Sequence, residues 1–146
     1  MPRLLHEHGA EVRKRIEALQ PTMTPRWGKM SVDQMLHHVN LVLLEAMGEY
    51  TPPRSIKGLP EWLIRFAIIE LPWGKGAPTR PDMRIPQGER YDFAKEKQSC
   101  LSLLERFLAK PMSDRWPRTA NFAMTGTHWS KLQYKHLNHH LEQFGV

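Results

Sequence analysis

Residues 31–48 read SVDQMLHHVNLVLLEAMG, and this stretch carries the clearest helical signal in the chain. Its apolar side chains recur every three or four residues, which is the spacing of one helix face. Ser31 followed by Gln34 has the form of a capping box, in which the two side chains satisfy backbone N–H groups at a helix start. The sequence therefore predicts a helix from Ser31 to about Gly48.

Three further stretches show helical periodicity, and helix breakers separate them. They predict helices over Pro2 to Leu19, Asp92 to Ala109, and Thr125 or Thr127 to Phe144, with Gly145 as a left-handed stop. The connection from Gly48 to Asp92 is rich in proline, so most of it cannot be regular; a short helix from Pro60 to Ile69 is the expected exception.

Because no sustained two-residue alternation appears, we expect an all-α fold. Four helices with one long connection favour a four-helix bundle in a single domain, residues 1–146.

Composition places the chain among ordinary globular proteins, with 146 residues, 40% hydrophobic and 25% charged. The longest apolar stretch, Trp62 to Ile69, contains Arg65 and is far shorter than the ~20 residues of a membrane-spanning helix. The first residues do not resemble a secretory signal, so we expect a cytoplasmic location. Cys100 is the single cysteine, which excludes an intramolecular disulfide and a cysteine-based zinc site, and it is interpreted as a core residue.

The chain has 21 basic and 15 acidic residues, for a net charge of +6. Such a charge raises the question of an anionic partner, either nucleic acid or a small molecule. The basic residues are scattered and form no long run of like charge, so nucleic-acid binding is not expected.

Histidine is the unusual residue type, with eight in the chain, and five of them cluster as His37, His38, His136, His139 and His140. In a helix, His136 and His140 lie one turn apart, about 6 Å along the axis, so both can bind one metal ion. Their mean direction coincides with the apolar stripe of Trp129 and Leu132, whereas His139 falls about 80° to one side. The pair is therefore expected to point into the bundle.

In the preceding histidine pair, His38 lies closer to the apolar stripe of its helix than His37 does. If the two helices are neighbours, His38, His136 and His140 form a three-nitrogen site with an open position for water or substrate. Glu45 lies seven residues after His38 on nearly the same face, where it is either a partner or base of this site or, more simply, a surface carboxylate. The alternative for the histidines is a structural role, and the five tryptophans are interpreted as packing residues.

Two distant motifs resemble one known family. Residues 27–38, WGKMSVDQMLHH, resemble the WGKMS…QMLxH pattern of a branch of the DinB-like superfamily. Residues 134–146, YKHLNHHLEQFGV, are similar to the terminal YKHLDHHLRQFG of that branch, and Ala77 to Pro81 is similar to a connector that it often carries. Two motifs in the same order are more specific than either one alone.

The resemblance implies a four-helix bundle with helices running up, down, down, up around a three-histidine metal centre. Residue by residue, its ligands map to His38, His136 and His140. Asn138 stands where the branch often has Asp, so no carboxylate next to the ligands is implied from that position. The expected cofactor is a divalent metal, Zn or Ni, with Fe or Cu as alternatives because imidazole suits all four.

Relatives in this superfamily include metal-dependent transferases and isomerases that use low-molecular-weight thiols such as glutathione, mycothiol or bacillithiol. The resemblance thus implies a thiol-dependent S-transferase, or a hydrolase using metal-bound water, that acts on a small molecule. It identifies no catalytic residue and no particular substrate. The alternative is a non-catalytic, stress-associated bundle that binds a small ligand or a partner, and a homodimer is the commonest assembly for either.

Overall fold

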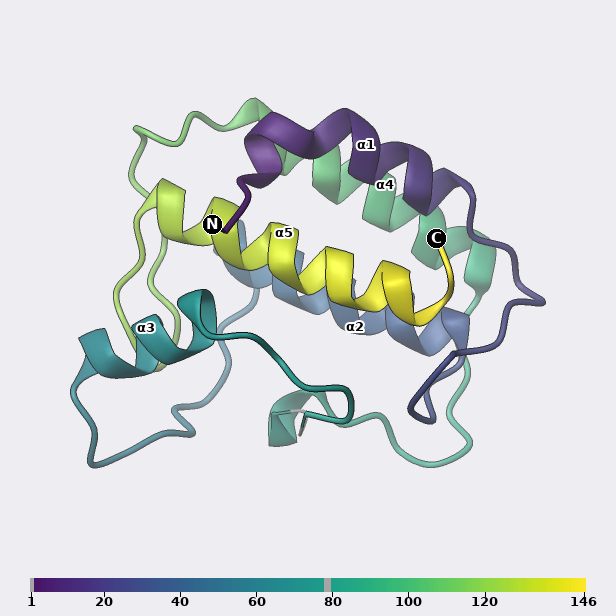
Figure 1. The fold of residues 1–146 in the computed structure, drawn as a ribbon, viewed down its shortest axis with the longest axis horizontal. Helices are drawn as coiled ribbons and strands as arrows, with labels where there is room; N and C mark the ends of the chain where they lie inside the picture. Colours follow the sequence, from purple (N-terminus) through teal and green to yellow (C-terminus); the bar gives the residue numbers. More distant parts are fainter. Residues whose placement is uncertain (1, 78–79) are drawn as a thin grey trace.

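A computed structural model describes residues 2–77 and 80–146 (Figure 1). Within these ranges the chain forms α-helices and no strand, so the expectation of an all-α fold is confirmed. The helices are α1 (Leu5–Glu17), α2 (Val32–Ala46), α3 (Glu61–Glu70), α4 (Phe93–Ala109) and α5 (Gly126–Gln143), and Pro81–Met83 forms a single 3-10 turn. None of these helices is long and apolar enough to cross a membrane in the part of the chain described.

The four longest helices pack around one apolar core. α2 contacts α4 and α5, and α1 contacts the same two helices from the other side. In Figure 1, α1 and α5 run from left to right, whereas α2 and α4 run from right to left. The neighbouring positions of α2 and α5 place the two helices that carry the clustered histidines side by side. The largest fully buried side chains come from all four helices and include Leu5, Ile16, Met35, Leu36, Leu43, Leu104, Phe107, Trp129, Leu137 and Leu141.

The ends of the helices follow the local sequence. At the start of α2, Gln34 Oε1 accepts a hydrogen bond from the Ser31 backbone N–H at 2.9 Å, which is one half of the predicted capping box. Ser31 Oγ has no hydrogen-bond partner among the described residues. Thr125 caps α5, because its Oγ1 accepts from the His128 N–H at 3.2 Å. After α5, Gly145 adopts a φ of +79°, a left-handed conformation that favours glycine.

The prediction for the first helix was too long, because α1 begins at Leu5 and ends at Glu17. Leu4 occupies the N-cap position with an extended backbone, and no side chain caps the helix there. The helical backbone therefore stops short at both ends: Leu4 is extended, and after Glu17 the chain forms only a turn in which the Leu19 N–H donates to the Ile16 carbonyl. Cys100 lies fully buried in α4, as expected, and burial raises the pKa of its thiol to about 12.

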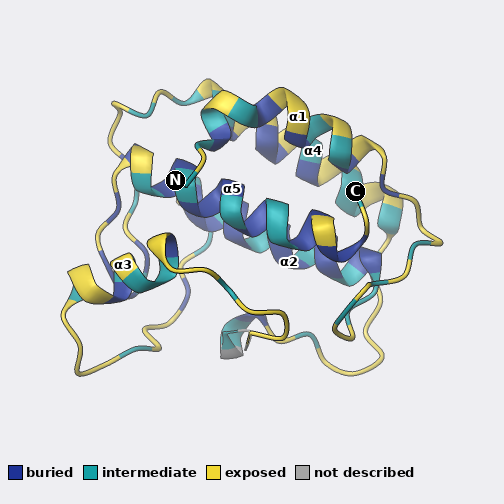
Figure 2. Cartoon of the chain, in the orientation of Figure 1, coloured by how far each residue is buried: buried dark blue, intermediate teal, exposed yellow. Residues whose placement is uncertain are grey.

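The predicted short helix is present as α3, which lies against α5. Only one face of α3 is covered, with Ile64 and Ile69 buried, while its outer face is exposed in Figure 2. Trp62 is 62% exposed, so its interpretation as a packing residue is wrong. The reason is that α3 packs against the surface of one helix instead of inserting between two.

Candidate metal centre

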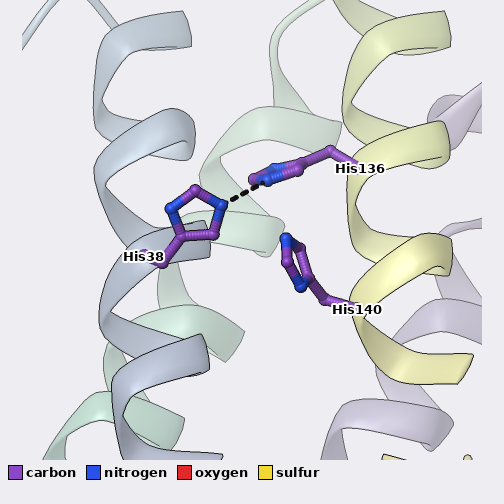
Figure 3. A group of neighbouring side chains, drawn as sticks. All are labelled: His38, His136 and His140. Carbon is purple, nitrogen blue, oxygen red and sulfur yellow. Dashed lines mark hydrogen bonds between the residues drawn. The ribbon is translucent and has the colours of Figure 1, made fainter. Parts of the chain in front are cut away.

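The three histidines selected from the sequence lie together in the interior. His38 comes from α2, His136 and His140 come from α5, and each is 7–8% exposed. Figure 3 shows the three rings pointing toward one another from the two helices. The Nε2 atoms of His38 and His136 lie 2.8 Å apart, and one nitrogen from each of the three rings lies within 4.8 Å of the others. These three residues are therefore close enough to bind one metal ion.

A buried glutamine holds the two helices in this register. Gln133, one turn before His136 on α5, is fully buried, and its Nε2 donates to the backbone carbonyl of Val42 on α2 at 3.0 Å. A side-chain hydrogen bond to the interior of a neighbouring helix fixes their relative position more specifically than apolar packing alone. Sequence reasoning missed Gln133; the only available signal was a polar residue on the apolar face of a helix.

The orientation of His140 is set by Gln143, which lies one turn later. Gln143 Nε2 donates to the Trp27 carbonyl at 2.8 Å, so its Oε1 faces His140 Nδ1, also at 2.8 Å. Because an amide oxygen only accepts, Nδ1 of His140 carries the proton and its Nε2 keeps a free lone pair. Such an outer hydrogen bond fixes the tautomer of a histidine that binds a metal. Sequence reasoning did not identify Gln143, although its spacing of three residues from His140 was visible.

The environment keeps the three imidazoles neutral. Burial, followed by the nearby His140 and Arg80, lowers the pKa of His38 to about 3. Burial lowers the pKa of His140 to about 4 and that of His136 well below its ordinary value. A neutral imidazole is the form that binds a metal, because its lone pair is free. This donor set fits a divalent ion that accepts nitrogen ligands.

The 2.8 Å contact between His38 and His136 joins two neutral rings, so one Nε2 donates a proton and the other accepts it. The Nδ1 atoms of both rings are buried and have no hydrogen-bond partner in the part of the chain described. Buried polar atoms without partners destabilise a fold by about 1–3 kcal/mol each. Three imidazoles packed together in this way are therefore a costly arrangement for a purely structural core.

A cavity of about 300 Å³ lies beside the histidines. Its walls are mainly apolar, and a few polar side chains share the lining. The apolar residues come from α2, α3, α5 and the connections, namely Val42, Ile56, Ile68, Trp73, Ala77, Met83, Phe122 and Leu132. An apolar cavity with a few convergent polar groups is the usual form of a small-molecule site.

Glu45 lines the same cavity, so its interpretation as a surface carboxylate is wrong. The residue is 3% exposed, and Arg80 Nη2 donates to Glu45 Oε2 at 3.0 Å. Burial raises the pKa of Glu45, while the guanidinium of Arg80 opposes that rise. The helical periodicity of α2 placed Glu45 on nearly the same face as His38. It could not show that Arg80, from the long connection after α2, meets the carboxylate there.

The other clustered histidines lie outside the group of three. His37 stacks on Tyr91 with ring centroids 3.8 Å apart, and its Nδ1 lies 3.1 Å from Glu96 Oε1. His139 lines the cavity, and its ring lies against Trp27, Trp73 and His140, with the centroids of the His139 and His140 rings 5.1 Å apart. Neither His37 nor His139 belongs to the group of histidines whose ring nitrogens are close enough to share a metal ion.

Asn138 also lies away from the three histidines. Its Oδ1 accepts from Arg15 Nη1 at 2.8 Å, and its Nδ2 donates to Glu142 Oε1 at 3.2 Å. Residue 138 therefore ties α5 to α1 and provides no group beside the candidate ligands.

Part of the sequence resemblance concerns the connector Ala77 to Pro81, in which Pro78 and Thr79 lie outside the described residues. Comparison of the chain with protein-family models, with curated proteins and with solved structures finds no match. Membership of the DinB-like superfamily stays a prediction, and the geometry of the three histidines and their cavity is the basis for assigning a function.

Proposed function

We propose that this protein binds one divalent metal ion through His38, His136 and His140 and acts on a small molecule in the adjoining cavity. The reaction is a thiol-dependent S-transfer or a hydrolysis by metal-bound water. The observation that supports this function is the meeting of three buried, neutral imidazoles in the lining of a mainly apolar cavity. Three protein ligands leave a further position open to water or substrate.

A bound divalent ion supplies a positive charge that lowers the pKa of a water or thiol in that open position and so generates a nucleophile at neutral pH. The chain contributes the rest of the site. Gln143 orients His140, and Gln133 keeps α5 in register with α2. The apolar walls exclude water around the reacting group, which strengthens electrostatic interactions inside the cavity.

The order and directions of α1, α2, α4 and α5 support assignment to the DinB-like bundle, because that resemblance implies helices running up, down, down, up. The long connection that carries α3 lies between α2 and α4, where the same resemblance expects it. We propose Zn or Ni as the metal, with Fe or Cu as alternatives, because three imidazole nitrogens suit each of them.

Metal analysis of the purified wild type and of single alanine variants tests this function. We expect about one equivalent of divalent metal in the wild type after reconstitution with Zn²⁺. The variants His38→Ala, His136→Ala and His140→Ala should each lose most of it, because two remaining nitrogens bind far more weakly than three. His37→Ala and His139→Ala are matched controls that should retain the metal. A folded wild type that takes up no metal would contradict the proposal.

Gln143 provides a second, graded prediction. In Gln143→Ala, His140 loses the acceptor for its Nδ1 proton and therefore its fixed orientation. We expect metal affinity to fall by about 10–100-fold, measured by competition with a chromophoric chelator. Glu142→Ala removes the neighbouring exposed side chain and should leave the affinity unchanged. Equal affinities in the wild type and Gln143→Ala would show that this hydrogen bond does not organise the site.

The mainly apolar cavity also favours a second candidate function, a binding bundle without catalysis that holds a small ligand. This candidate differs in what it predicts for the histidines. A ligand would still bind to the wild type after thorough removal of metal, and alanine variants of the three histidines would keep that binding.

A further inference from the structure

The outer face of α3 is an exposed apolar surface. Its large side chains come from the helix and from the residues on either side of it, and they are Leu59, Trp62, Leu63, Phe66 and Leu71. We refer to these five residues as the α3 patch. Within the helix, Trp62, Leu63 and Phe66 lie in one sector of about 100°, so they point the same way. Trp62 is 62% exposed and Phe66 is 50% exposed.

The exposed apolar surface of the molecule is concentrated in this one place. Elsewhere in the described part of the chain, the large hydrophobic side chains are buried or only partly accessible. Single exposed apolar residues scattered over a surface are ordinary, whereas a group on one element marks a contact with another molecule or with a membrane. Figure 2 shows α3 at the edge of the molecule with its outer face exposed.

Basic side chains lie next to the α3 patch. Arg54 and Lys57 are exposed in the segment that leads into it, and Arg65 belongs to α3 itself. Arg54 Nε donates to the Ile56 carbonyl at 3.4 Å, and Arg65 Nη1 donates to the Ala123 carbonyl at 3.0 Å. A carbonyl group is neutral, so these hydrogen bonds leave the positive charge of both arginines uncompensated.

The two acidic residues of α3 do not cancel this charge, because each is paired with a cation from outside the helix. Arg118 Nη2 lies 2.5 Å from Glu61 Oε1, and Lys131 Nζ lies 3.1 Å from Glu70 Oε1. Arg118, through its hydrogen bond, and Arg54, through its charge, lower the pKa of Glu61, which shows that Arg54 lies within electrostatic reach of α3. The surroundings of the α3 patch therefore carry a net positive charge.

An apolar face surrounded by cations matches the surface of a bilayer that contains anionic lipids. Apolar side chains enter the boundary between headgroups and acyl chains, while lysine and arginine stay at the level of the phosphates. Tryptophan favours this boundary because its ring is amphipathic. A second copy of the chain fits less well, because a symmetric dimer would bring the same cations against one another while both nearby acids are already paired.

We propose that α3 and the segments on either side of it dock this protein on the surface of an anionic lipid bilayer, with the α3 patch inserted among the headgroups. This inference goes beyond the proposed function and does not depend on metal binding. α3 also contributes Ile68 to the wall of the cavity. Because a helix is about 10 Å thick, docking brings the cavity close to the bilayer, which is a source of apolar molecules.

Sedimentation with vesicles tests the docking of the full chain. One set of vesicles contains equal parts of phosphatidylglycerol and phosphatidylcholine, and the other contains phosphatidylcholine alone. We expect the wild type to bind the anionic vesicles at least tenfold more tightly, because each basic residue near the surface adds to the attraction. Raising the salt from about 50 mM to about 500 mM should weaken this binding, because the ions screen the charges.

Two variants with the same change of net charge separate docking through α3 from general attraction of a basic protein. Arg54→Glu/Lys57→Glu should bind the anionic vesicles at least tenfold more weakly than the wild type. Lys14→Glu/Lys29→Glu, at exposed positions away from α3, should stay within about threefold of the wild type, because charges more than a Debye length from the bilayer are screened.

A third variant, Trp62→Ala/Phe66→Ala, tests insertion of the apolar side chains and keeps every charge. Its binding should fall at least tenfold, because it removes most of the apolar area that the bilayer would cover. Both positions are exposed, so its melting temperature should stay close to that of the wild type. The tryptophan fluorescence of the wild type should shift to the blue on anionic vesicles, and Trp62→Phe should bind without most of that shift.

The possible failures are distinct. Equal weakening in the two charge variants, or full binding by Trp62→Ala/Phe66→Ala, would reduce the interaction to general adsorption and overturn the inference. Absence of vesicle binding would overturn it as well. If the wild type were then a dimer in analytical ultracentrifugation and Trp62→Ala/Phe66→Ala a monomer, the α3 patch would be a contact between copies of this chain. Each of these results leaves the metal proposal intact, because the variants keep all three histidines.

Discussion

The metal-free protein is expected to lose stability steeply as the pH falls below about 6.5, the ordinary pKa of histidine. In the unfolded chain, His38, His136 and His140 take up protons near this pH. In the folded protein they stay neutral, because burial lowers the pKa of His38 to about 3 and that of His140 to about 4. Since the unfolded state binds more protons between these values and pH 6.5, acidification favours unfolding, and above pH 7 the effect vanishes.

The effect is large because three groups act together. Each histidine that only the unfolded state protonates contributes about 1.4 kcal/mol per pH unit, so three contribute up to about 4 kcal/mol per pH unit. A domain of ordinary stability, about 5–15 kcal/mol, should then unfold close to pH 4. Urea unfolding at pH 7.5, 6.5, 5.5 and 4.5, in the presence of a chelator, measures this slope.

The variant His136→Leu checks the assignment of the slope. It replaces one buried imidazole with an apolar side chain of similar size, so the dependence on pH should fall by about 1.4 kcal/mol per pH unit. His8→Gln, at a partly exposed position on α1, is the control and should leave the slope as it is in the wild type. A free energy of unfolding that stays constant from pH 7.5 to 4.5 would refute the prediction.

Gly126→Ala is expected to destabilise the fold by about 3 kcal/mol or more. Gly126 is the buried first residue of α5, and an added Cβ would lie 2.6 Å from Met112 Cα and 2.6 Å from Trp116 Nε1. It would approach the Met112 carbonyl oxygen more closely still. Two of these three atoms belong to the backbone, which cannot rotate away as a flexible side chain can. The start of α5 would therefore have to separate from the segment after α4.

Gly74→Ala is the matched control, because an added Cβ there meets no atom within 4 Å and the backbone has no left-handed conformation. Its stability should lie within about 0.5 kcal/mol of the wild type. Thermal unfolding of the two variants measures the difference, and a shift of about 10 °C is expected for Gly126→Ala. Similar melting temperatures for the two variants would contradict the close packing at Gly126.

The helices were predictable because their signals are local. The periodicity of α2, its capping box at Ser31 and the glycine after α5 depend only on residues within one or two turns of one another. The start of α1 was less predictable, because no capping side chain marks it. The exposure of Trp62 was not predictable, because it depends on how many neighbours α3 acquires.

The candidate site was predictable to the extent that it follows from helix faces. Rotation about the helix axis selected His38 over His37, and the spacing of four residues paired His136 with His140, and the structure brings these three together. Rotation also placed Glu45 on nearly the face of His38. It could not decide between a partner of the site and a surface carboxylate, because the group that meets Glu45 is Arg80, 35 residues later in the chain. Gln133 and Gln143 were missed because each donates to a backbone carbonyl on a distant segment, Gln133 to Val42 and Gln143 to Trp27. Every residue has a backbone carbonyl, so the sequence does not mark these partners.

The sequence by itself determined that the chain is helical and which of the clustered histidines on α2 and α5 face inward. Both properties follow from a repeat of 3.6 residues, which any helix imposes on its own side chains. The tertiary structure alone decided that α2 and α5 are neighbours, that Arg80 bonds to Glu45, and that this pair and the three histidines line one cavity. Contacts between distant segments depend on how all the helices share one core, and no local pattern records that arrangement.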